Sequence, residues 1–191
     1  MQAVTLLRLQ ARANHLANHR LQAAMAPLSA AELHAPRTSF FPTLMATLNH
    51  ILMVDQYYIG ALLGEAGLGG HWSRFVPDPE LAALARRQRA SDERLIAFCD
   101  VLDDAGCERP VEMPRAATRV QCDAAAHVLQ HLFMHQTHHR GQAHAMLSGT
   151  IVAPPQLDEF LMPSDAALRR ADMAALGWDE AAVYGLHGHL A

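Results

Sequence analysis

Apolar residues recur at intervals of three and four along four long stretches of the chain, which is the pattern of amphipathic helices. These stretches are rich in Ala and Leu and contain little Gly or Pro, and they predict helices over residues 4–25, 39–63, 79–104 and 121–147. Clusters of Gly and Pro between them indicate loops. Two shorter helices are expected over residues 164–174 and 178–184, where acidic residues stand at each predicted start.

The predicted elements define the fold class and the domain organisation. No window alternates apolar and polar residues for long enough to indicate a strand, so we expect no sheet. Four long helices with substantial loops predict an all-α fold, namely a four-helix bundle with short extra helices at the C-terminal end. We expect residues 1–150 to form the bundle and residues 151–191 to form an extension of the same domain.

Composition and charge exclude several classes of protein. The chain has 191 residues, a formal net charge of −4 and 51% hydrophobic residues, so it is neither disordered nor a general nucleic-acid binder. No apolar run approaches the ~18 residues that a membrane span needs. The three cysteines form no CxxC pair, which favours free thiols in a reducing cytoplasm, with Cys99 in the core.

Histidine is unusually frequent, with 13 residues, and six of them lie between His127 and His144. At 100° per residue, His135 and His139 fall inside the apolar stripe of the helix predicted over residues 121–147. The others lie at or beyond its edge or on the opposite flank: His127, His131, His138 and His144. We therefore expect His135 and His139 to be buried and the other four to be wetter.

His135 and His139 are four residues apart, so both imidazoles lie on one helix face and can chelate one metal ion. A third ligand is expected from another helix. His50 is the first candidate because it lies in a segment that is apolar nearly all round, between Leu48 and Ile51. His15 or His19, a second pair with the same spacing, is the next candidate.

Asp55 falls on the apolar side of the helix predicted over residues 39–63, where a carboxylate needs a cationic or metal partner. Three roles are open to it. It can be a fourth metal ligand, an acceptor for the N–H of a ligating histidine, or the partner of an arginine on a neighbouring helix such as Arg20. The last two are favoured over direct ligation.

Four segments together resemble the DinB-like family of bacterial metal-binding four-helix bundles. They read NHLANHRL, TLMATLNHILMVDQYYIGALLG, HQTHHRGQAHAML and PPQLDEFL, and the resemblance runs from about Leu6 to Leu161. The pair formed by TLNH and HxxxHRGQ is the specific part of the resemblance.

The resemblance implies one divalent metal ion per chain, zinc or nickel, held by three histidines. On this sequence they are His50, His135 and His139, so the resemblance favours His50 over His15 as the third ligand. It also implies a homodimer. The wider superfamily includes thiol S-transferases that use bacillithiol, mycothiol or glutathione, as well as many members without a known reaction. A low-molecular-weight thiol or an electrophile is therefore a candidate partner.

Three neutral histidines with open coordination positions are typical of a catalytic metal site. Such a metal lowers the pKa of a bound thiol or water, so thiol transfer and metal-dependent hydrolysis are both coherent reactions. His131 and His138 flank the pair and are candidates for proton relay or substrate binding, beside their simpler interpretation as solvated side chains. Arg140, Gly141 and Gln142 are expected to be structural, with Gly141 allowing close helix approach.

Three other architectures or roles compete with this interpretation. A di-iron bundle requires Glu-x-x-His motifs, which the segments 39–63 and 121–147 lack. A non-enzymatic protein can use the same metal for stability or for sensing a stress. A histidine-rich metal buffer would bind several ions per chain and engage the flanking histidines as well.

Overall fold

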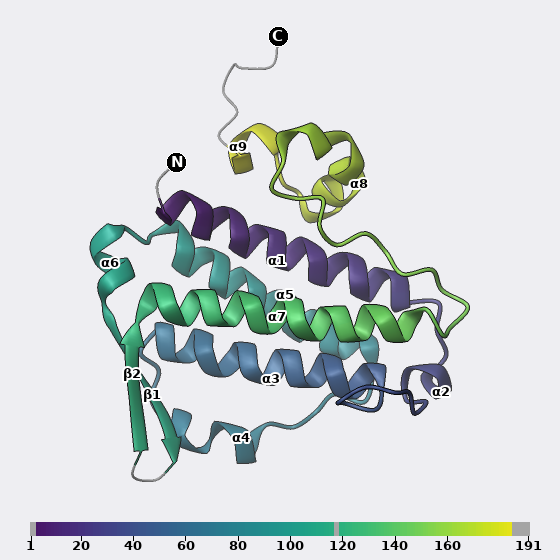
Figure 1. Cartoon of the computed structure of the whole chain (residues 1–191), viewed down its shortest axis with the longest axis horizontal. Coiled ribbons are helices and arrows are strands. Elements are labelled where there is room, and N and C mark those ends of the chain that lie inside the picture. The colour runs from purple at the N-terminus through teal and green to yellow at the C-terminus, as the bar shows by residue number, and fades with distance from the viewer. Residues whose placement is uncertain (1–2, 117–118, 185–191) are drawn as a thin grey trace.

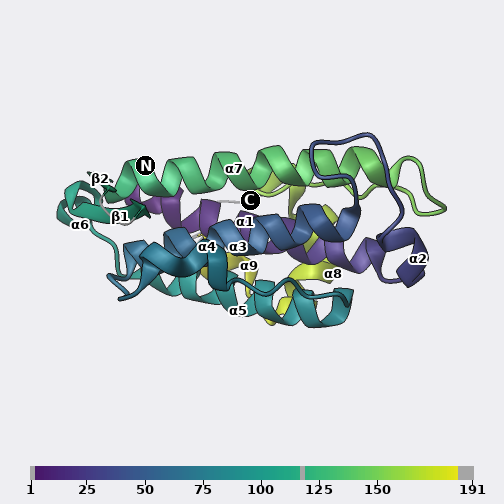
Figure 2. The same ribbon diagram turned by 90° about the horizontal axis from the view of Figure 1, so that it is seen from below.

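The computed structural model describes residues 3–116 and 119–184 and is mostly helical (Figure 1). Its four long helices are α1 (Ala3–Met25), α3 (Leu44–Leu62), α5 (Leu81–Asp100) and α7 (Ala125–Leu147). Helix α1 packs against α5 and α7, and α3 packs against the same two helices, so the four lie side by side (Figures 1 and 2). The sequence-based expectation of a mostly helical fold is therefore confirmed.

Local capping explains where several helices begin and end. The prediction for α3 began at residue 39, but the helix begins at Leu44, where the Thr43 hydroxyl accepts a hydrogen bond from the Ala46 N–H at 3.0 Å. Ser29 and Glu32 form a reciprocal capping box at the short helix α2 (Ala30–Leu33). Helix α8 (Ala166–Leu176) ends at Gly177, whose φ of 69° is the left-handed geometry that glycine adopts at low cost.

A two-stranded antiparallel sheet corrects the expectation that the chain has no sheet. Strand β1 (Pro110–Ala116) pairs with β2 (Arg119–Ala124) directly before α7, at one end of the long helices (Figure 1). In β1 Val111 and Met113 face the core, and β2 exposes most of its residues. The alternation is thus too short to be recognised in the sequence, and α7 begins at Ala125 instead of residue 121.

Short elements fill the connections between the long helices. They are a 3₁₀ turn at Leu68–Gly70 followed by α4 (His71–Arg74), then α6 (Asp104–Glu108), and a 3₁₀ turn at Pro163–Asp165 before α8. In the described part of the chain, no helix is both long enough and apolar enough to cross a membrane.

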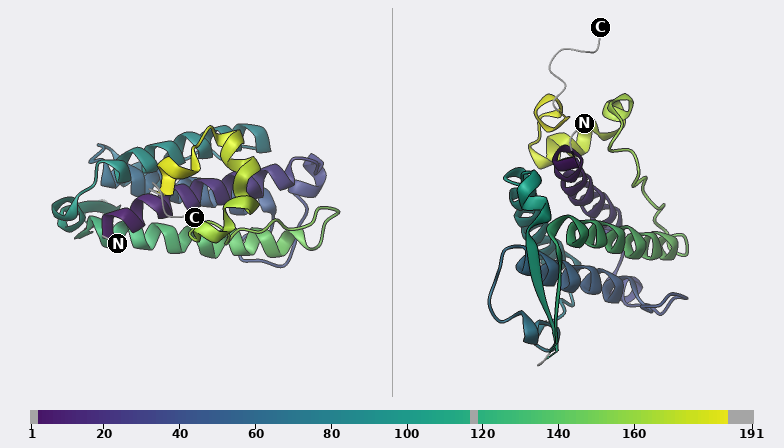
Figure 3. Two further views of the ribbon diagram at one scale, coloured as in Figure 1. Left: turned by 90° about the horizontal axis from the view of Figure 1, so that it is seen from above. Right: turned by 60° about the vertical axis from the view of Figure 1, so that its left-hand side comes forward.

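The C-terminal segment covers the outer face of α1. Helices α8 and α9 (Glu180–Tyr184) lie over α1 when the molecule is seen from above (Figure 3). Phe160 and Met173 are buried against Leu16 and Ala17 of α1. Arg20 also ties this segment to α1, through ion pairs with Glu159 and Asp172.

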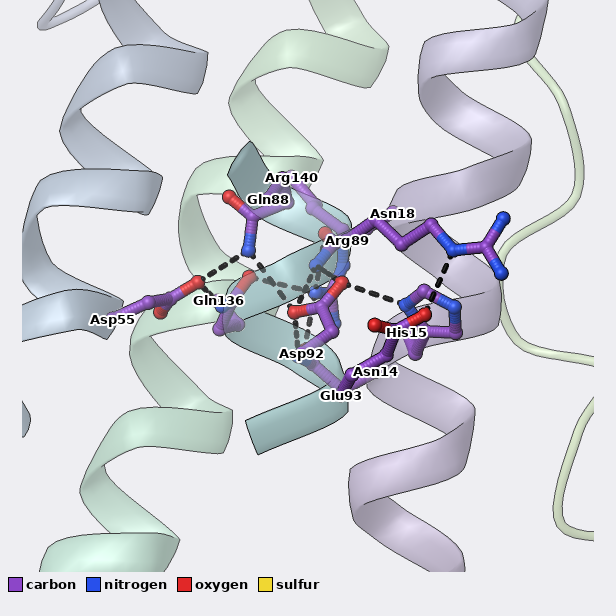
Figure 4. Close-up of polar contacts among 10 residues, drawn as sticks. All are labelled: Asn14, His15, Asn18, Asp55, Gln88, Arg89, Asp92, Glu93, Gln136 and Arg140. Atoms are coloured by element: carbon purple, nitrogen blue, oxygen red, sulfur yellow. Dashed lines mark hydrogen bonds and ion pairs between the residues drawn. The ribbon is translucent and has the colours of Figure 1, made fainter. Parts of the chain in front are cut away.

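Among the described residues, the interior contains three apolar clusters, one of which joins α1 to the C-terminal segment. The other two, one toward the sheet and one toward α2, are separated by a polar layer. Between them, each long helix contributes buried polar side chains to one connected set, here called the polar layer (Figure 4). Its members are Asn14, His15, Asn18, Asp55, Gln88, Asp92, Gln136 and Arg140.

Candidate metal centre

Helices α3 and α7 pack side by side and bring three histidines together. His50 comes from α3, and His135 and His139 come from successive turns of α7. One nitrogen of each ring lies within 4.8 Å of the corresponding atoms of the other two. We call this group the histidine cluster. It brings together the three residues that the sequence singled out as ligands.

The hydrogen bonds of the cluster leave lone pairs available. The Nε2 atoms of His50 and His135 lie 3.0 Å apart. At this distance one neutral imidazole can donate a proton to the other, or both nitrogens can present lone pairs to a shared cation. Nδ1 of His139 lies 2.8 Å from Oε1 of Gln142, so it carries the proton and leaves the Nε2 lone pair free. Nδ1 of His135 is buried with no partner among the described residues.

The three rings are held in their neutral form. Burial lowers the pKa of His50 to about 4, with the nearby His139 as the second cause. Burial, followed by the proximity of His139 and His50, lowers the pKa of His135 to about 3. Burial also lowers the pKa of His139, partly opposed by the hydrogen bond to Gln142. Neutral imidazoles whose lone pairs converge are the form that a divalent metal ion requires, so this donor set fits one.

An apolar cavity of about 480 Å³ lies beside His50. The ring of Phe41 packs over that of His50, with centroids 4.2 Å apart and planes inclined by 30°. Met45, Met53 and Phe75 supply much of the remaining lining. The volume is typical of small-molecule sites, and the apolar lining suits an uncharged body on a substrate.

The two flanking histidines lie outside the cluster. His138 is exposed, and its Nε2 is 3.1 Å from Nε2 of Gln142, the residue that also contacts His139. His131 is exposed as well, and its ring packs against Tyr58 with centroids 5.0 Å apart. His138 is thus connected to the cluster through Gln142, whereas His131 lies next to a separate cavity that Tyr58 and His127 also line.

Asp55 is completely buried, as expected, but its partners differ from those expected. It accepts hydrogen bonds from Nε2 of Gln88, at 2.7 Å, and from Gln136. The suggested ion pair with Arg20 is wrong, because Arg20 pairs with Glu159 and Asp172 on the far side of α1. Among the described residues, no hydrogen bond joins Asp55 to a histidine of the cluster.

The sequence interpretation missed most of the polar layer. In α7 the same 100° periodicity that selected the histidines places Gln136 in the middle of the apolar stripe, with Arg140 one turn later. Both are buried, and NH1 of Arg140 donates to Gln136, at 2.9 Å, and to Asn14 and Asn18 of α1. The position of the Gln136 amide within the apolar stripe of α7 was therefore a signal in the sequence that could have revealed the polar layer.

Two smaller expectations are also settled by the structure. Cys99 is fully buried, as expected, and burial raises the pKa of its thiol to about 12. Gly141 does not allow close helix approach, because a Cβ added there would meet nothing within 4 Å.

These features define a mostly helical protein with three histidines positioned to bind a metal ion. A sequence profile of the DinB family matches residues 1–171, and the chain therefore belongs to the DinB family. The match ends inside α8 and includes every residue of the histidine cluster and of the polar layer. No curated protein matches the chain in sequence.

Proposed function

We propose that the protein binds one divalent metal ion, zinc or nickel, through His50, His135 and His139, and transfers a low-molecular-weight thiol to an apolar electrophile. The observation that carries this proposal is the convergence of three neutral imidazoles, one of which, His50, lines a mostly apolar cavity. A divalent ion bound there would lower the pKa of a coordinated thiol or water toward neutrality.

The chain's own residues supply orientation and exclusion of water. Gln142 accepts the Nδ1 proton of His139 and so directs Nε2 toward the other two rings. Phe41 covers one face of His50, and the apolar lining of the cavity holds the body of the electrophile next to that ring. In the reaction, the thiol loses its proton to solvent, its sulfur bonds to an electrophilic carbon, and the bond from that carbon to the leaving group breaks. The leaving group then departs with its electron pair.

Thiol transfer is favoured over hydrolysis by the composition of the cluster. Hydrolysis by a metal-bound hydroxide is aided by a general acid–base group that moves a proton to the leaving group, and among the described residues no carboxylate joins the three histidines. A thiol whose pKa has been lowered is itself the nucleophile and needs no such base once it is ionised. Metal-dependent hydrolysis is therefore the second candidate, and a metal that only stabilises or senses is the third.

Metal analysis of protein purified without a histidine tag tests the site. We expect about one equivalent of tightly bound metal per chain, lost in His50→Ala and in His135→Ala. His127→Ala, an exposed histidine on the same helix, is the matched control and should keep the metal. Retention of one equivalent in His135→Ala would refute the three-histidine site, and several weakly held ions would indicate a metal buffer instead.

Activity measurements then separate the reactions. The metal-loaded protein should consume glutathione, bacillithiol or mycothiol in the presence of an apolar aryl halide, and His50→Ala should not. Ester hydrolysis without thiol consumption would favour the hydrolase. A lack of both activities, together with a large fall in melting temperature on metal removal, would favour a structural or sensing role.

Architecture and assembly are proposed on the family relationship. We propose that the four long helices form a bundle of the DinB type and that the protein is a homodimer. Light scattering coupled to size-exclusion chromatography measures the mass directly, and a mass near 20.9 kDa, that of one chain, would contradict the dimer.

A further inference from the structure

A second cavity, of about 520 Å³, lies away from the histidine cluster, between α1, α2 and α5. Most of its lining is apolar, and Leu28, Leu33 and Leu81 are among the residues that form it. None of its lining residues is His50, His135 or His139. Its volume falls within the range of small-molecule sites, so it can hold a ligand of its own.

The polar layer reaches this cavity through His15 and Asp92, which both line it. Nδ1 of His15 lies 3.0 Å from Oδ2 of Asp92, and the two side chains are 5% and 1% exposed (Figure 4). Buried polar groups are normally hydrogen-bonded. A polar atom of this pair that makes no hydrogen bond within the protein therefore indicates which hydrogen-bonding group a ligand must carry.

The hydrogen bonds around Asp92 fix the roles of both residues. Asp92 accepts from the amide nitrogens of Gln88, at 3.0 Å, and of Asn18, at 3.1 and 3.0 Å on its two oxygens. Amide N–H groups only donate, so the carboxylate is an acceptor at both oxygens, and His15 must donate to it through Nδ1. In a neutral ring, Nε2 of His15 is then a hydrogen-bond acceptor.

Nε2 of His15 makes no hydrogen bond to any residue that the structure describes, although the residue is only 4% exposed. The other charged residues of the lining, Glu80, Arg86 and Arg89, are exposed, and water screens their charges. His19 also lines the cavity but is only half-buried. Nε2 of His15 is therefore an acceptor without a hydrogen bond on the cavity wall, and Nδ1 of the same ring is bonded to Asp92.

We propose that this cavity binds a small apolar alcohol or phenol, whose hydroxyl donates a hydrogen bond to Nε2 of His15. The apolar lining takes the body of the ligand, and the hydroxyl donates to the Nε2 atom of His15, which makes no hydrogen bond among the described residues. This site is separate from the metal site, and neither proposal depends on the other.

Calorimetric titration with 2-naphthol and 2-methoxynaphthalene tests the proposal on the full chain. The two probes share the same ring system, but only 2-naphthol can donate a hydrogen bond. We expect one binding site per chain for 2-naphthol and about tenfold weaker binding of the methyl ether. Equal affinity of the two probes, or no binding of either, would overturn the proposal without any need for a variant.

His15→Asn sharpens the test, because the asparagine Nδ2 can keep the donor to Asp92 while the acceptor Nε2 is lost. This variant should bind 2-naphthol about tenfold more weakly and the ether as before, so that the two affinities become equal. His127→Asn is the matched control and should change neither affinity. Ala85→Leu, which places a larger side chain in the lining, should weaken both probes.

The same titration distinguishes this cavity from the metal site. His50→Ala should bind 2-naphthol as the unmodified protein does. If His50→Ala loses the probe while His15→Asn retains it, 2-naphthol binds at the histidine cluster and the proposed second site is wrong.

Discussion

The histidine cluster and the polar layer are both groups of polar side chains among the long helices, but they differ in how fully they are bonded. In the polar layer, Asp92 accepts from Gln88, Asn18 and His15, and Arg140 lies near enough to balance its charge. In the histidine cluster, Nε2 of His50 faces Nε2 of His135, and Nδ1 of His135 has no partner among the described residues.

This difference indicates different roles for the two groups. Every member of the polar layer is hydrogen-bonded to another member, although Oδ1 of Asp55 is buried with no partner among the described residues. Such a network fixes the alignment of the helices and leaves little for a ligand to satisfy, except at its edge. A cluster of converging lone pairs is satisfied only when a cation joins it. Substitutions in the polar layer should therefore reduce stability, whereas substitutions around the cluster should reduce metal affinity first.

The largest effect is expected from Asp92→Asn. The new amide group would point N–H donors at the donors of Asn18, Gln88 or His15, and Arg140 would lose its ionised partner. We expect a loss of about 3 kcal/mol or more in the free energy of unfolding, measured by urea denaturation. Asp100→Asn on the same helix removes an exposed ion pair with Arg12 and should cost below about 1 kcal/mol. Similar losses in both variants would contradict the role given to the polar layer.

Gln142→Ala should affect the histidine cluster specifically. Without the Oε1 that accepts the Nδ1 proton of His139, that ring loses its fixed orientation, and metal affinity should fall about 10- to 100-fold. Competition with a chelator measures this affinity. The exposed Gln130→Ala on the same helix is the control, and an unchanged affinity in Gln142→Ala would show that Gln142 does not position the ring.

Asp55 allows a test of charge within the polar layer. Burial, and secondly the nearby charge of Asp92, raise the pKa of Asp55 well above its ordinary value, so the folded state favours the neutral acid. This group's contribution to stability is therefore full below the unfolded pKa of about 4 and is lost as pH rises through the folded value. Asparagine does not ionise, so Asp55→Asn does not lose stability in this way as pH rises. At pH 8 the free energy of unfolding of the variant should exceed that of the unmodified protein by about 1 kcal/mol.

Thermal and urea denaturation across pH would check this prediction. Near pH 4 the two proteins should be about equally stable, because the amide resembles the protonated acid in shape. A variant that is less stable at every pH would show that Asp55 acts as a buried anion paired with Arg140.

The smallest effect is expected at Gly141, which lies on α7 between Arg140 of the polar layer and Gln142, the residue that contacts His139. Its added Cβ would meet nothing, so Gly141→Ala should stabilise the protein by about 0.5–1 kcal/mol through helix propensity alone. Metal affinity should stay unchanged. A loss of stability would show that the glycine is needed for a backbone motion or a contact made by another chain.

Features that depend on residues close together in the chain could be predicted from the sequence, and features that depend on distant residues could not. The four long helices and the pairing of His135 with His139 depend on residues three to four apart, so periodicity alone revealed them. His50 was only a first candidate from its apolar surroundings, and the family resemblance decided in its favour. The sheet could not be predicted, because β1 is short, with Val111 and Met113 turned toward the core, and β2 exposes most of its residues.

The sequence by itself determined the helical elements and which histidines share a face, since both depend on local geometry. Only the tertiary structure decided the partners of the buried polar groups. The residue that balances Asp92 lies on α7, its hydrogen-bond donors lie on α1 and α5, and Asp55 bonds to Gln88 and Gln136 and not to Arg20. These pairings join residues far apart in the chain, and their geometry exists only once the helices have packed.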